Sequence, residues 1–180
     1  AELKEIRKAN QQLLAHSEKA TDLRELIHND QQQQQHNLSD MVRTRAQRIK
    51  DETSATVETS IEDGVTVVSH PLVTTAIAEL FENAIAHHTG NSPPHLAVTV
   101  QASGDEGMMY IEDDGPGIDT GEVAALTNRE ETALSHGSGV GLWLVEHIVR
   151  KSNGSLSITD AATLSGTRAT IRLPQPADCT

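Results

Sequence analysis

The first residues that could do chemistry are a carboxylate, an amide and an imidazole spaced four positions apart: Glu79, Asn83 and His87. Residues four apart lie on one face of an α-helix. Carboxylate and amide oxygens arranged in this way can bind a hard cation directly or through its waters, and Mg²⁺ held by few protein ligands usually also binds substrate phosphates. A solvated helix face explains the same spacing, so these residues alone do not decide the matter.

A second group, Asp113–Gly117 (Asp-Asp-Gly-Pro-Gly), directly follows a β-rich run. Two glycines within three residues let the backbone approach a flat ligand or adopt positive φ. A carboxylate at the end of a strand can accept a charge-assisted hydrogen bond of about 1.5–3 kcal/mol from an exocyclic amine such as that of adenine. Asp113 is the better candidate, because Asp114 can point to solvent. A plain β-turn or a calcium-binding acidic loop is the alternative.

A third group consists of Gly137, Gly139 and Gly141, followed by Leu142 and an apolar segment. Glycines alternating at the start of a helix expose backbone N–H groups to phosphate. This is not a phosphate loop of the Walker type, since Lys-Ser/Thr does not follow, and a flexible hinge is the alternative. Ser165–Thr167 in isolation indicates only a turn.

The surrounding sequence predicts the elements that must position these groups. Apolar periodicity predicts helices at 1–28, 38–50, 71–90 and 139–152, with a short helix near 122–128. β-rich runs occupy 55–60, 65–68, 96–101, 108–112, 155–160 and 167–173. We expect three antiparallel hairpins: 55–60 with 65–68, 96–101 with 108–112, and 155–160 with 167–173. The first would turn around Glu62–Gly64. The polar stretch 29–37 is interpreted as a linker.

About six strands, mostly antiparallel neighbours, with three interspersed helices predict an α/β fold. The expected architecture is a two-layer α/β sandwich preceded by a long N-terminal helix. The expected domains are a helical segment with its linker at 1–37, a folded domain at 38–175 and a tail at 176–180. Residues 1–28 are interpreted as an amphipathic helix that pairs in a hairpin or dimer bundle, with a solvated helix as the alternative.

Composition excludes several classes of protein. The 180 residues allow one domain, or one domain with a helical appendage. The net charge of −12 argues against binding nucleic acid or an anionic membrane. No apolar run reaches the roughly 18 residues of a transmembrane span, and the polar N-terminus lacks a secretory signal, so we expect a cytoplasmic segment. The single cysteine, Cys179, excludes an intrachain disulfide.

The order of the motifs is more specific than any one of them. ExxxN on a helix, DxGxG after a strand, GxGxGL before a helix and GT before a final strand together resemble the ATP-binding domain of sensor histidine kinases, a family grouped with the gyrase-type ATPases. The resemblance covers about residues 38–175. The run HGSGVGLWLVEHIV is most similar to haloarchaeal members, in agreement with the acidic, lysine-poor composition of a high-salt cytoplasm.

This resemblance implies a Bergerat-type fold, with a mixed, mostly antiparallel sheet and helices on one face, and Mg-ATP as the cofactor. It implies that Asn83 coordinates Mg²⁺, that Glu79 is the polarising base and that Asp113 receives the adenine amine. The other implied ATP-binding residues are His87, Gly115, Gly117, Gly137, Gly139, Gly141, Leu142 and Thr167. His87 would meet a phosphate when protonated.

The sequence departs from the family pattern in two places. Ala86 stands where many members have a basic residue, and Ile118–His136 contains no Phe, although many relatives have an aromatic lid motif. Arg129 is the only Lys or Arg in that segment and a candidate phosphate contact. Phosphate neutralisation and lid closure are therefore expected to differ from those of relatives.

The implied activity is that of an ATP-dependent protein-histidine kinase, one part of a two-component sensor. Phosphoryl transfer requires an acceptor held in line and a metal that offsets oxygen charge. The family's acceptor histidine lies about a hundred residues before the asparagine motif, so we expect it outside this chain. The fragment would form a homodimer through its N-terminal helix and signal to a response regulator receiver domain; the parent could be membrane-attached.

Other interpretations remain open. His16 and His36 superficially resemble acceptor histidines. His87 and His88, with His95 or His136, could bind a transition metal. Alternative functions are an anti-sigma-type protein serine kinase, against which the long first helix argues, and a non-catalytic nucleotide-binding scaffold. The intact motifs make the scaffold less favoured.

Overall fold

The computed structural model describes residues 33–86, 88–90, 92–117 and 139–177. The predicted helices at 1–28 and 122–128 lie outside these ranges. The chain divides into two units between Gln31 and Gln32, and the second unit holds every described residue. The predicted boundary after residue 37 stays a prediction.

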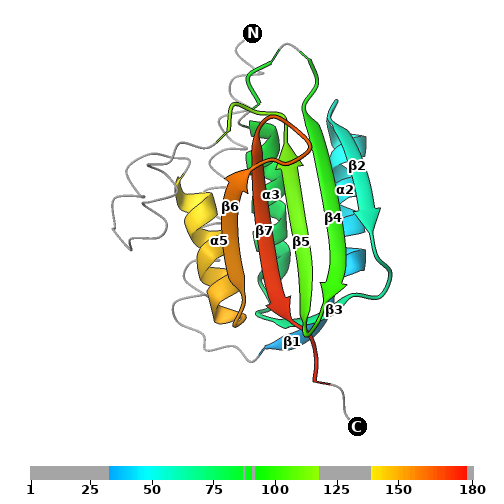
Figure 1. Ribbon diagram of the computed structural model, residues 1–180, viewed down its shortest axis with the longest axis vertical. Helices are drawn as coiled ribbons and strands as arrows, with labels where there is room; N and C mark the ends of the chain where they lie inside the picture. The colour runs from blue at the N-terminus through cyan, green and yellow to red at the C-terminus, as the bar shows by residue number, and fades with distance from the viewer. Residues whose placement is uncertain (1–32, 87, 91, 118–138, 178–180) are drawn as a thin grey trace, which may run out of the picture. The chain divides into compact units, whose positions relative to one another are not determined.

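The second unit is built on a five-stranded sheet covered by helices on one face, seen in Figure 1 from the uncovered side. The strands, in spatial order, are β2 (Thr56–Ile61), β4 (His95–Ser103), β5 (Glu106–Asp113), β7 (Thr167–Pro174) and β6 (Ser155–Asp160). β2 and β4 are parallel, and the other neighbours are antiparallel. The helices are α2 (Leu38–Glu52), α3 (Val73–Ala86) and α5 (Gly139–Lys151). The predicted two-layer α/β sandwich is confirmed.

Alternation along the strands separates the two faces of the sheet. On β4, Leu96, Val98 and Val100 are buried, while the residues between them are half-buried. Because side chains alternate across a strand, this pattern places the apolar set against the helices. The helices contribute Val42, Ile49, Phe81, Leu144 and Ile148 to the same core.

Helix α2 begins and ends close to its predicted limits. The Asn37 side chain accepts a hydrogen bond of 3.0 Å from the backbone N–H of Asp40, which caps the first turn. Leu38, Val42 and Ala46 form the buried stripe. Helix α3 begins at Val73, two residues later than predicted, because the backbone N–H of Val73 bonds to the carbonyl of His70 in a turn that precedes the helix.

Two predictions about the N-terminal strands are wrong. Residues 34–37, expected in a linker, form strand β1 (Gln34–Asn37), which pairs with β3 (Thr66–Ser69) in a separate two-stranded sheet. Consequently β2 and β3 do not form the expected hairpin, and β2 pairs in parallel with β4. Backbone hydrogen bonding lets a polar run serve as a short edge strand. The segment that contains Val65 and Val67 buries both side chains and does not join the main sheet.

The other predicted hairpins are confirmed. β4 and β5 are joined at Gly104, whose φ is +64°, and β6 pairs with β7. Helix α5 ends at Lys151, one residue before its predicted limit. Asn153 has a φ of +55°, and the Gly154 N–H bonds to the Val149 carbonyl at 3.0 Å, which closes the end of the helix. No helix in the described ranges is long and apolar enough to cross a membrane.

We predict that Gly154→Ala destabilises the domain by about 1–3 kcal/mol, because its Cβ would overlap the carbonyl oxygen of Arg172 and lie 2.8 Å from Leu173 Cδ2. Urea unfolding would measure the loss. The control is Gly104→Asn, since nothing lies within 4 Å of a Cβ there and Asn tolerates a positive φ. Equal stability of the two variants would contradict the prediction.

Candidate nucleotide-binding site

The segments that carry the sequence motifs meet at one end of the sheet. The C-terminal end of α3, the end of β5, the β6–β7 turn and the first turn of α5 all lie at the upper end of the domain in Figure 1. An interaction across this end confirms the proximity of α3 and β5. His88, two residues after α3, is 3.0 Å from the carboxylate of Asp114, the residue that follows β5.

Glu79 and Asn83 lie on α3 under the first turn of α5. Glu79 is buried with 4% of its surface exposed, and Asn83 is half-buried. A Cβ at Gly141 would overlap Glu79 Oε2 and lie 3.8 Å from Asn83 Oδ1. A larger residue at position 141 would therefore have to displace the Glu79 carboxylate. The N-terminus of a helix carries partial positive charge, which favours anionic groups such as a carboxylate or a phosphate.

Asp113 is held at the end of β5 by backbone N–H groups from two segments. Its Oδ1 accepts hydrogen bonds from Gly115 N at 2.9 Å and Thr167 N at 3.1 Å, and its carbonyl accepts one from Gly166 N at 3.0 Å. Both hydrogen bonds to the carboxylate in the described ranges are accepted by Oδ1, so a ligand amine can approach Oδ2. A side chain held by two N–H groups is pre-organised to accept that amine.

The glycines of the DxGxG motif have different surroundings. Gly117 has a φ of +82°, a conformation that disfavours other residues, with nothing within 4 Å of a Cβ. The N–H of Gly115 is the donor that bonds to Asp113. In the motif of the β6–β7 turn, Gly166 is buried, and its Cβ would overlap Asp113 Oδ1 and lie 2.6 Å from Gly115 N. The turn therefore touches the aspartate directly.

Several sequence candidates cannot be placed. His87, Gly137 and Arg129 lie outside the described residues, as does His136. Gly139 is the first residue of α5, and Leu142 is half-buried in its first turn.

Asp114 is not the solvent-directed residue that the sequence analysis allowed. Its Oδ1 is 3.0 Å from both His88 Nδ1 and the backbone nitrogen of His95, and His88 Nε2 is 2.8 Å from the Ser92 carbonyl. Burial by itself raises the pKa of Asp114, but the His95 N–H and the His88 imidazole outweigh it and lower the pKa below its usual range. Asp114 therefore ties the segment after α3 to the end of β5.

Glu112 is a buried carboxylate that sequence reasoning missed. It is 3% exposed and accepts hydrogen bonds from the N–H of Ala162, from the N–H and hydroxyl of Thr163 and from the Arg168 side chain, whose Nε is 2.5 Å away. Arg168 also lies over the Tyr110 ring, 5.3 Å from its centroid. Glu112 and Arg168 are opposed in the β5–β7 register. The sequence does place a glutamate in one predicted strand and an arginine in another. It does not show that the two strands are neighbours in the sheet, or which of their residues face each other.

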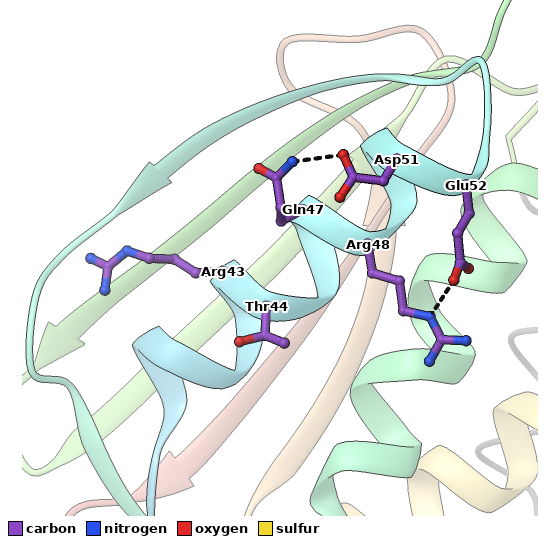
Figure 2. A pocket seen from close by; sticks show the side chains of 6 residues that line it. All are labelled: Arg43, Thr44, Gln47, Arg48, Asp51 and Glu52. Carbon is purple, nitrogen blue, oxygen red and sulfur yellow. Dashed lines mark hydrogen bonds and ion pairs between the residues drawn. The ribbon is translucent and has the colours of Figure 1, made fainter.

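A hollow on the surface of α2 is unrelated to these motifs (Figure 2). It is lined by Arg43, Thr44, Gln47, Arg48, Asp51 and Glu52, all from α2. Figure 2 shows two interactions along the helix, Gln47 to Asp51 at 2.9 Å and Arg48 to Glu52 at 2.8 Å. Paired polar side chains on one helix indicate a solvated face.

The donor atoms suit a magnesium ion bound together with phosphate. Glu79 and Asn83 offer carboxylate and amide oxygens beside the α5 N-terminus, and hard oxygen ligands are those that Mg²⁺ prefers. No group of three or more His, Cys, Asp or Glu residues able to hold a metal is found among the described residues. The transition-metal alternative through His88 and His95 therefore has no support within that part of the chain.

Comparison with known proteins identifies the family. The profile described as "Histidine kinase-, DNA gyrase B-, and HSP90-like ATPase" matches residues 68–177, more than half of the chain. The chain belongs to this family.

Two sensor proteins are similar to part of this ATPase-family chain. The chain is 31% identical over 103 residues to the sensor protein BasS of Escherichia coli (strain K12), and 29% identical over 102 residues to BasS of Salmonella typhimurium (strain LT2). Each match covers 55% of this chain, but 28% and 29% of the respective BasS chains. The matched region thus spans less than a third of these curated relatives.

Solved structures share the fold. The catalytic domain of the histidine kinase ThkA has a TM-score of 0.67 at 14% identity, covering 81% of this chain and 97% of that one. The mycobacterial sensor histidine kinase MprB has a TM-score of 0.64 at 23% identity, covering 80% and 99%. Full-length ShkA in complex with AMPPNP has a TM-score of 0.72 at 15% identity, covering 93% of this chain and 37% of that one. The predicted Bergerat-type fold is confirmed.

The ionised state of Glu112 should stabilise the domain above about pH 5. Burial by itself raises its pKa, but the Thr163 hydroxyl and N–H, the Arg168 guanidinium and the Ala162 N–H lower the pKa to about 2 from an ordinary 4.5. Since the folded-state value is depressed, this stabilisation is present above pH 4.5 and is lost as the pH falls toward 2. A shift of this size corresponds to about 3 kcal/mol.

We therefore predict that wild type loses up to about 3 kcal/mol more unfolding free energy than Glu112→Gln when the pH is lowered from 6 to 2.5. Urea unfolding of both proteins across this range would measure the difference, since the remaining carboxylates titrate in both. If the unfolding free energies of the two proteins fell in parallel with pH, Glu112 would not be the group that causes the acid destabilisation.

Proposed function

We propose that this domain binds Mg-ATP and transfers the γ-phosphate to a histidine on a dimerisation helix, as the catalytic part of a two-component sensor histidine kinase. The family match and the similarity to BasS support this proposal. The single observation that carries it is the arrangement of Asp113, whose Oδ1 is held by two backbone N–H groups. A strand-end carboxylate with one fixed oxygen suits recognition of the adenine amine.

The residues at the other side of the site suit the phosphates. Asn83 would hold the metal, and Glu79 would polarise the attacking group. Bound Mg²⁺ would offset the negative charge of the phosphate oxygens during transfer. The proximity of Gly141 to both side chains supports placing the phosphates near the first turn of α5.

The remaining ATP contacts are proposed from the family pattern. Gly115 and Gly117 would form the floor under adenine, and Thr167 would lie beside the aspartate. Gly137 and Gly139 would act in the lid hinge, with Leu142 lining the site. His87 would contact a phosphate when protonated.

The proposed partners are a second copy of the chain, bound through the N-terminal helix, and a response regulator receiver domain. The acceptor histidine would belong to the parent protein upstream of this chain. The fragment would therefore supply the ATP-bound half of the reaction.

Replacing Asp113 with Asn should weaken ATP binding by about tenfold or more, because Oδ2 would lose its charge-assisted contact with adenine. Calorimetry with Mg²⁺ in molar salt would measure the two dissociation constants. Asp105→Asn, in the turn at the opposite end of β5, is the matched control and should bind as wild type does. Failure of wild type to bind ATP at millimolar concentration would favour the scaffold alternative.

The fragment alone should not autophosphorylate, but it should phosphorylate a histidine-bearing hairpin from its own parent. Radiolabelled ATP would reveal the product as an acid-labile, base-stable label, as expected for phosphohistidine. Acid-stable label would instead indicate a serine kinase. A hairpin with its histidine replaced by Gln is the control and should remain unlabelled.

A further inference from the structure

We propose that Glu112 is a positioning residue that sets the adenine preference of the site by holding the β6–β7 turn against Asp113. This inference rests on the proposed function, since it concerns the same ATP site. It assigns a role to a side chain that faces away from the nucleotide.

Glu112 and Asp113 lie on opposite faces of the sheet, because adjacent side chains alternate across a strand. Asp113 pairs in register with Leu96, whose side chain is fully buried on the helix side. Glu112 therefore lies on the uncovered face, where its hydrogen-bond donors belong to Ala162, Thr163 and Arg168. It cannot touch a nucleotide bound beside Asp113.

The residues that bind Glu112 belong to the segment that holds Asp113. From the turn, the Ala162 N–H lies 3.3 Å and the Thr163 N–H 2.9 Å from the Glu112 carboxylate oxygens. The turn is closed by a bond of 2.9 Å from Ala161 N to the Gly166 carbonyl. Immediately after this closure, Gly166 N and Thr167 N donate to Asp113. One carboxylate thus fixes the turn, and the turn fixes the next carboxylate.

The β6–β7 turn packs so closely against Asp113 that the two must move together. A Cβ on Gly166 would overlap Asp113 Oδ1 and would lie 2.7 Å from the Asp113 carbonyl oxygen. A shift of the turn must therefore move the Asp113 carboxylate or remove its N–H donors. Rotation of that carboxylate would misdirect Oδ2, since hydrogen bonds weaken steeply with poor alignment.

The effect of losing Glu112 should be confined to recognition of the adenine ring. In the part of the chain that the structure describes, Asn83 and Gly141, proposed to serve the phosphates, make no hydrogen bond to Glu112 or to residues 161–166. Loss of Glu112 should then weaken recognition of the exocyclic amine while leaving the phosphate contacts intact. Inosine triphosphate tests this separation, because it carries a carbonyl oxygen in place of the adenine amine and so cannot donate the exocyclic hydrogen bond to Asp113.

The experiment compares ATP and inosine triphosphate binding by calorimetry in wild type, Glu112→Gln and Glu106→Gln. Glu106 is the matched control: it lies on the same face of β5, its side chain is 40% exposed, and its one ion pair within the described residues is with Arg172 at 3.7 Å. Wild type should prefer ATP by about tenfold. Glu112→Gln should reduce this preference by roughly fivefold, mainly through weaker ATP binding, and Glu106→Gln should leave it unchanged.

Thr163→Val provides a second variant in case Glu112→Gln does not fold. Thr163 is exposed, and the substitution removes only its hydroxyl donor to Glu112. It should reduce the ATP preference in the same direction, by about twofold.

The possible results separate this inference from the proposed function. If wild type binds no ATP, the proposed function fails and this inference fails with it. If wild type prefers ATP and the Glu112 and Thr163 variants keep the same preference, only the positioning role is overturned. Equal weakening of both nucleotides by Glu112→Gln would also overturn it, since that result indicates a general structural role.

Discussion

The antiparallel pairing of β5 with β7 is the constraint on which the candidate site depends. Its register sets Glu112 opposite Arg168 and brings the start of β7 to the end of β5. There the N–H groups of Gly166 and Thr167 reach Asp113, a residue distant in sequence. A one-residue slip would turn both acidic side chains to the wrong faces of the sheet. The sheet thus determines which carboxylate is structural and which can meet a ligand.

Close packing of glycine against acidic side chains recurs on both sides of this site. Gly166 touches the Asp113 carboxylate, and Gly141 touches that of Glu79. In each case a Cβ at the glycine would overlap a carboxylate oxygen. The motif glycines near these carboxylates therefore act by allowing approach. Gly117 differs, since it has open space and a positive φ, and its contribution is backbone conformation.

Most of the fold in the described residues could be predicted because its signals are local. Apolar periodicity located α2, α3 and α5, and alternation with turn residues located the two C-terminal hairpins. The N-terminal strands were predicted wrongly, since Gly64 between two β-rich runs indicates a change of direction but not the partner of either strand. β2 pairs with β4, whereas β3 pairs with β1 and buries Val67 in the core. Such burial is a property of the assembled core.

The sequence by itself determined the order of the motifs, the family they resemble, and Glu79, Asn83 and Asp113 as candidate ligands, because residue type and local spacing carry that information. Only the tertiary structure decided that Asp114 binds His88 and that Glu112 is buried among donors from a distant turn. The physical reason is that a carboxylate's role depends on which N–H groups and charges surround it. Those neighbours come from strands and turns brought together by long-range pairing, which no local pattern of residues encodes.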